Sequence, residues 1–241
     1  MKLYSFLLMV GCVGTSIAFA QQAASKPTNV SPMVASRIAV WTNRVLTNPT
    51  YSLAVAGGRD PHEFLAEAEG RICSDAAPIP CPGALAWAAK AALEASENKT
   101  AHDYAVRSLQ SADSAAAYYE KHGRKAPRSY ANVPMADFYG NFVLGRLAIL
   151  NGDVRSAEGY LLASGKTLGD PSLSSGPNMS LALELLKHGD AQSRQVVLQY
   201  FDEVKAFWAT SQGLLDRWSA RVAAGETFLF GVDEGIDVLF K

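Results

Sequence analysis

The stretch PMADFYGNFVLGRLAIL, residues 134–150, decides the fold. Its only charged or amide side chains are those of Asp137, Asn141 and Arg146. Proline is favoured in the first turn of a helix, and the Asn-Gly-Asp sequence at 151–153 is typical of a turn that ends one. A helix that is apolar on nearly every side is buried among other elements. Residues 134–150 are therefore expected to form a central helix with other helices packed around it.

Apolar residues also recur every three or four positions on both sides of this stretch, which is the period of an amphipathic helix. No segment shows the sustained two-residue alternation of a half-buried strand, and the abundant alanine favours helix. We therefore predict an all-α fold of about nine helices arranged as antiparallel hairpins, either as an α-α superhelix or as an irregular bundle. The expected helices are 31–48, 60–72, 84–95, 101–120, 134–150, 154–164, 177–188, 191–209 and 212–224.

The charge of the 241-residue chain is nearly balanced. Its 22 Lys and Arg residues stand against 23 Asp and Glu residues, for a net charge of −1 at pH 7. A protein without excess positive charge has no long-range field that attracts nucleic acid or an anionic membrane surface. The composition, with 49% hydrophobic and 19% charged residues, suits a folded core and argues against disorder. Nucleic acid is therefore not an expected partner.

The first twenty residues predict a signal peptide. Lys2 supplies a positive start, an apolar stretch follows, and Ala18-Phe19-Ala20 has small residues where a signal peptidase cleaves. Cleavage after Ala20 implies a periplasmic or secreted protein. A lipoprotein acylated at Cys12 is the less favoured alternative, since Met9 stands where such a signal usually has Leu.

The rest of the chain divides into three parts. Residues 21–30 are polar and aperiodic and predict a flexible leader, residues 31–225 predict a single helical domain, and residues 226–241 form an apolar tail that is expected to dock. No segment after residue 20 has about 18 apolar residues without a charge, so no transmembrane segment is expected in the mature chain.

Cys73 and Cys81 lie eight residues apart in a proline-containing stretch. Two nearby cysteines in an exported chain favour a local disulfide. Two unrelated buried thiols are an alternative. A metal site is the least favoured, because His62 is the only other soft ligand nearby in the sequence and none of the four histidines has the i, i+4 partner of a helical zinc site. No metal or other cofactor is expected.

Residues 144–157, LGRLAILNGDVRSA, resemble a tetratricopeptide repeat (TPR), a motif of about 34 residues that folds as two antiparallel helices. The motif has Leu-Gly in its first helix, a Gly-Asp turn and a small Ala in its second helix. Gly145, Gly152 and Ala157 stand at the matching intervals. The glycine and alanine let the two helices touch, and the turn glycine accepts a left-handed conformation.

The resemblance covers one repeat well and its neighbours loosely. Asn141 stands where the motif has Trp, and Leu161 stands where it has an aromatic residue. Residues 84–120 and 177–209 are similar only as helix hairpins. The chain is also similar to exported bacterial proteins of unassigned function that contain this repeat, which implies an architecture and a compartment but no chemistry.

The resemblance further implies a partner-binding surface. The second, fifth and ninth positions of the repeat face its groove, and these positions are Tyr139, Phe142 and Arg146. Aromatic and arginine side chains are enriched at binding hot spots. The alternative for Arg146 is a structural ion pair with Asp137 or Glu158.

These observations favour an exported, non-catalytic scaffold that binds a protein or peptide. The sequence has no Gly-x-Ser-x-Gly motif and no complete phosphate-binding loop, so no catalytic residue is assigned. Two alternatives stay open: an all-α enzyme with its site near the loop 165–176, and a structural subunit of an envelope assembly.

Overall fold

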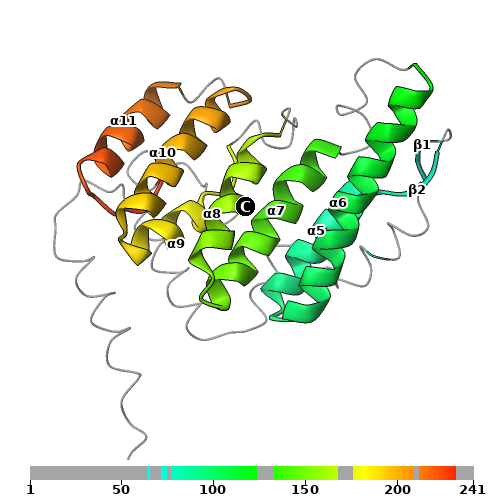
Figure 1. Cartoon of the computed structure of the whole chain (residues 1–241), viewed down its shortest axis with the longest axis horizontal. Helices are drawn as coiled ribbons and strands as arrows, with labels where there is room; N and C mark the ends of the chain where they lie inside the picture. The colour runs from blue at the N-terminus through cyan, green and yellow to red at the C-terminus, as the bar shows by residue number, and fades with distance from the viewer. Residues whose placement is uncertain are drawn as a thin grey trace, which may run out of the picture.

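In the computed structural model, the part of the chain described is residue 65 and residues 72–74, 77–123, 133–167, 176–208 and 212–231. This part contains seven helices and one short pair of antiparallel strands (Figure 1). The strands are β1 (Ile72–Ser74) and β2 (Ala77–Pro80), and the helices are α5 (Pro82–Glu94), α6 (Asn98–Lys121), α7 (Val133–Leu150), α8 (Val154–Gly165), α9 (Ser180–His188), α10 (Ala191–Lys205) and α11 (Gln212–Ala223).

The prediction of an all-α fold is confirmed for the described residues, and each helix expected after residue 80 is present there. The expected helix 31–48 lies outside the described residues. Of the expected helix 60–72 only Leu65 is described, and it is helical. The strand pair β1–β2 was not expected, because strands of three and four residues are too short to show alternation.

The helices stack in chain order, as Figure 1 shows from α5 to α11. Three-residue turns after α5 and α7 and a two-residue turn after α9 fold the chain into the pairs α5–α6, α7–α8 and α9–α10. Helix α7 packs against both helices of the preceding pair, against α8 and against α9, while α10 packs against α8, α9 and α11. The predicted central position of residues 134–150 is therefore the one that α7 occupies.

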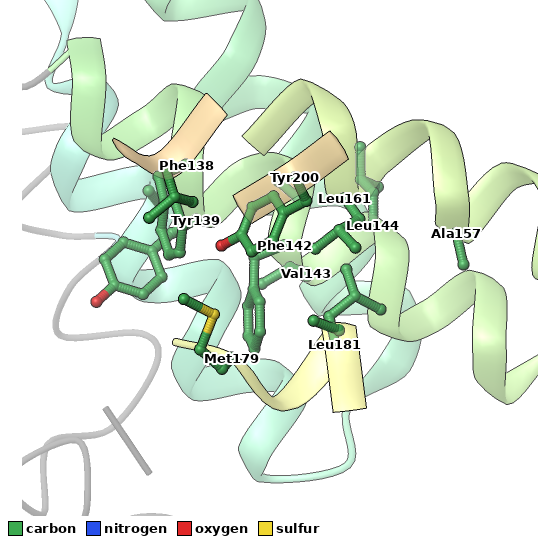
Figure 2. Close-up of a cluster of buried hydrophobic side chains, with 14 of the residues drawn as sticks. Phe138, Tyr139, Phe142, Val143, Leu144, Ala157, Leu161, Met179, Leu181 and Tyr200 are labelled. Atoms are coloured by element: carbon green, nitrogen blue, oxygen red, sulfur yellow. The ribbon is translucent and has the colours of Figure 1, made fainter. Parts of the chain in front are cut away.

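The core follows from small residues at the helix contacts and large ones between them. The α5–α6 interface consists largely of buried alanines, which let the two helices approach closely. Around α7 the core contains larger side chains from four helices and from the turn before α9 (Figure 2). They include Phe138, Val143, Leu144, Leu161, Met179, Leu181 and Tyr200.

A buried carboxylate joins α8 to α10. Glu158 accepts hydrogen bonds from Arg155 Nη1 at 2.6 Å, from Gln192 Nε2 at 3.1 Å and from the Ser193 hydroxyl at 2.7 Å. Arg155 also reaches Asp190 Oδ2 at 3.2 Å, and Asp190 caps α10 by accepting from the Ser193 backbone N–H. A buried charge with several partners holds two helices in one register, because moving them would leave it unpaired.

The apolar tail docks over its described part, residues 226–231. Phe230 is fully buried, with its ring centroid 5.1 Å from that of Trp218 and 5.5 Å from that of Phe201. The guanidinium carbon of Arg221 lies 3.6 Å from the centroid of the Phe228 ring. The tail therefore extends the core beyond α11.

Cys81 is disulfide-bonded and stands directly before α5. The antiparallel pairing of β1 with β2 aligns Ile72 with Pro80 and so places the backbone of Cys73 beside the end of β2. The hydroxyl of Ser111 in α6 donates to the carbonyl of Pro80, which holds the strand pair against α6. A disulfide excludes the alternatives of a free thiol or a metal ligand at Cys81, and its pairing with Cys73 stays a prediction.

We predict that mass spectrometry of the unreduced protein will find one peptide pair linked through Cys73 and Cys81. Cys73→Ser should free Cys81 for alkylation and lower the free energy of unfolding by about 2–3 kcal/mol, because a small loop is no longer closed in the unfolded chain. Alkylation of both cysteines without reductant would contradict this pairing.

Two glycines provide a matched test of the packing around α7. A Cβ on Gly145 would collide with Leu181 Cδ2 and lie 3.2 Å from Tyr160 Cβ, whereas a Cβ on Gly159 in α8 would meet nothing within 4 Å. We expect Gly145→Ala to lose about 1–3 kcal/mol of stability through overpacking. Gly159→Ala should gain up to about 1 kcal/mol from helix propensity. Urea unfolding measures both, and equal effects would refute close α7–α9 contact.

Candidate functional site

Arg146 lies between α7 and α9, with 29% of its side chain exposed. Its Nε is 2.7 Å from Glu184 Oε2, and its Nη1 donates to the Ser180 hydroxyl at 3.0 Å. The guanidinium carbon is 5.9 Å from the centroid of the Phe142 ring. Arg146 therefore forms the ion pair that the sequence allowed, but the expected partners, Asp137 and Glu158, were wrong. Glu158 is instead held by α10.

Tyr139 and Phe142, the other two predicted partner-binding residues, are each only 4% exposed. The Tyr139 ring stacks on Trp87 of α5, with 4.9 Å between the ring centroids. Helix α5 therefore occupies part of the face that the repeat geometry assigned to a partner. Of the three predicted residues, the structure brings only Arg146 to the surface, with the two aromatic rings beneath it.

A second ion pair lies on α5, where the sequence analysis assigned no role. Lys90 Nζ is 2.6 Å from Glu94 Oε1, with the Lys90 side chain 3% exposed and that of Glu94 21% exposed. Lys90 also lies 5.5 Å from the centroid of the Trp87 ring. The available signal was a Lys-x-x-x-Glu spacing on a helix with no other charge.

These side chains form what we call the charged row, which consists of Lys90, Glu94, Arg146, Ser180 and Glu184. The row crosses the first helix of each of the three pairs, since its members lie on α5, α7 and α9. Arg146 is close enough to Glu94 to act on its charge. The two cations and two carboxylates leave the row with no net charge.

Burial raises the pKa of both carboxyl groups in the charged row. For Glu94 the loss of solvent outweighs the opposing attraction of Lys90 and Arg146. For Glu184 it outweighs the attraction of Arg146, Lys187 and His188. Taking a carboxylate out of water disfavours its charged form, and nearby cations restore only part of that loss.

Hydrogen bonding in the charged row is incomplete. Glu94 Oε2, Glu184 Oε2 and Arg146 Nε are buried and make no hydrogen bond, so Arg146 and Glu184 are paired by charge alone at the short contact. This contrasts with Glu158, whose carboxylate accepts three hydrogen bonds. Buried polar groups without partners are uncommon and mark a position where another molecule can supply the missing contact.

The described residues contain no group of three or more His, Cys, Asp or Glu that suits a metal ion. None of the described helices combines the length and the apolar character that crossing a membrane requires. Of the loop 165–176, proposed for an enzymatic site, residues 168–175 lie outside the described part. Thr167 at its start donates a hydrogen bond to the carbonyl of Pro134, which attaches it to α7.

No protein-family model, curated protein or solved structure matches the chain. A function is therefore inferred from the chemistry of the charged row.

The raised pKa values predict how stability depends on pH. The folded state binds protons at Glu94 and Glu184 more tightly than the unfolded state, so their contribution is fully present below the ordinary pKa of 4.5 and is lost as the pH rises through the folded values. Glu94→Gln/Glu184→Gln should therefore gain stability relative to the wild type as the pH increases from about 4.5 to about 8.

Urea unfolding across this pH range measures the difference. Glu120→Gln, at an exposed glutamate of α6, controls for the loss of a surface carboxylate. A double variant whose stability runs parallel to that of the wild type at every pH would show that burial does not disfavour the two charges.

Proposed function

We propose that this protein is an exported, non-catalytic scaffold of TPR-like helix pairs that holds a peptide or a partner protein against its charged row. The observation that carries the proposal is the placement of incompletely bonded charges on the first helix of three successive pairs. In stacked helix pairs, equivalent helices line one continuous surface, which is how such architectures bind extended partners.

The energetics of the row support a binding role over a structural one. Burying an ion pair costs desolvation that its mutual attraction repays only when geometry and hydrogen bonding are both good. The Arg146–Glu184 contact lacks that hydrogen bond, and Glu94 Oε2 has no partner. Apolar side chains at these positions would stabilise the fold at least as well, so the charges serve something other than folding.

The proposal of TPR-like pairs draws on the residues that carry the resemblance. Gly145 lies against Leu181 at the α7–α9 contact, Gly152 has a φ of +77° in the turn after α7, and Ala157 is fully buried. Close helix contact, a left-handed turn residue and a small buried residue are what the repeat requires of these positions.

Export is proposed from the leader sequence, whose residues 1–20 lie outside the described part. The disulfide at Cys81 supports this compartment, because disulfides persist in oxidising surroundings. We propose a periplasmic or secreted location, with acylation at Cys12 as the alternative.

Site-specific photo-crosslinking in an envelope extract of the source cells tests the scaffold. A photoreactive residue at position 150 lies one helical turn from Arg146, where Leu150 is 61% exposed. A photoreactive residue at Asp113, exposed on α6, is the control. We expect one protein to crosslink at position 150 and not at 113. Arg146→Met/Glu184→Gln should lower its capture about tenfold, as for a lost contact of about 1.4 kcal/mol.

The double substitution removes one charge of each sign, so it leaves no new unpaired charge between α7 and α9. Its melting temperature and circular dichroism spectrum should stay close to those of the wild type. Loss of the fold without a separate binding defect would place Arg146 in the core as a structural residue. Equal crosslinking at positions 113 and 150 would also argue against the charged row as the binding surface.

A further inference from the structure

The charged row has one open donor beside one open acceptor. Arg146 Nη2 makes no hydrogen bond and is not among the buried atoms that lack one, so it is accessible to solvent. The same holds for Glu184 Oε1. The contact between Arg146 Nε and Glu184 Oε2 keeps the two groups together. A ligand that reaches this point meets a donor and an acceptor at once.

The charge balance of the row restricts what kind of ligand that is. A ligand carboxylate that approaches Arg146 also faces Glu184 and Glu94, and a ligand ammonium that approaches Glu184 also faces Arg146 and Lys90. Attraction and repulsion therefore largely cancel for a charged group of either sign. A neutral group that both donates and accepts a hydrogen bond gains from both partners and loses to neither.

We infer that Arg146 and Glu184 bind the main chain of an extended, uncharged peptide segment, with Arg146 donating to a backbone carbonyl and Glu184 accepting from a backbone N–H. In an extended chain the N–H and C=O of one residue point to the same side, as they do in strand pairing. This inference rests on the proposed scaffold function and names the part of the ligand that is recognised.

The neighbours of the pair suit the side chains of such a segment. Leu150 is exposed one turn further along α7, Ile149 is half-buried next to it, and Trp87 of α5 is half-buried beside the Lys90–Glu94 pair. These residues offer apolar surface on either side of Arg146. Recognition therefore combines a polar main-chain contact with apolar side-chain contacts and needs no ligand charge.

Binding of defined peptide pools tests the inference. The probes are three pools of octapeptides, acetylated and amidated at their ends, that contain uncharged residues only, added Asp and Glu, or added Lys and Arg. Mass spectrometry identifies the peptides that immobilised protein retains. We expect retention from the uncharged pool, with a Kd that changes less than about threefold between 50 and 500 mM NaCl, since no net charge is neutralised.

The best uncharged sequence is then resynthesised with a methyl group on each backbone nitrogen in turn. Methylation at the recognised residue removes its N–H and should weaken binding about tenfold or more, as for a lost hydrogen bond to a charged group. Arg146→Met/Glu184→Gln should weaken binding equally. Glu184→Gln alone keeps an accepting oxygen and should retain most of the affinity. Arg155→Met, which removes a comparable ion-paired arginine from α8, is the control.

The outcomes separate this inference from the proposed function. Retention of only the acidic or only the basic pool, with steep salt dependence and loss in the double variant, would leave the scaffold function standing and overturn main-chain recognition. Binding that survives methylation at every backbone nitrogen would also overturn it. Retention of no peptide from any pool would overturn both the inference and the proposal that this surface holds a peptide.

Discussion

The burial of α7 on nearly all sides is the constraint on which the rest of the structure depends. Its apolar surface is satisfied only when α5, α6, α8 and α9 all pack against it. The contact of Gly145 with Leu181 then sets how closely α9 approaches. Because α10 and α11 follow from α8 and α9, a single helix without a solvent face orders the whole stack.

Two groups of buried charge in this stack have opposite characters. Glu158 accepts three hydrogen bonds and connects α8 to α10, so its charge is compensated within the protein. The charged row spans α5, α7 and α9 with carboxylate and guanidinium atoms that have no hydrogen-bond partner. Satisfied charges stabilise one arrangement, whereas unsatisfied ones leave capacity for a ligand. The difference separates a structural network from a candidate site.

Local sequence was enough to predict the helices. Pro134 and the turn at Asn151–Asp153 bounded α7 within one residue, because helix starts and stops depend on side chains within one turn. Helix α9 begins at Ser180 instead of the expected 177, since Asn178 accepts the Ser180 backbone N–H just before the helix. The strand pair β1–β2 escaped prediction because pairing, not periodicity, defines such short strands.

The sequence by itself determined the helical class, the central helix and the presence of one charged residue, Arg146, late in that helix. Only the tertiary structure decided that Tyr139 and Phe142 are buried, because α5 packs against the face that a regular repeat would leave open. It also decided that Arg146 meets Glu184. Helix formation depends on neighbours along the chain, but the partner of a buried charge depends on which helix faces meet, and that is set by packing between distant segments.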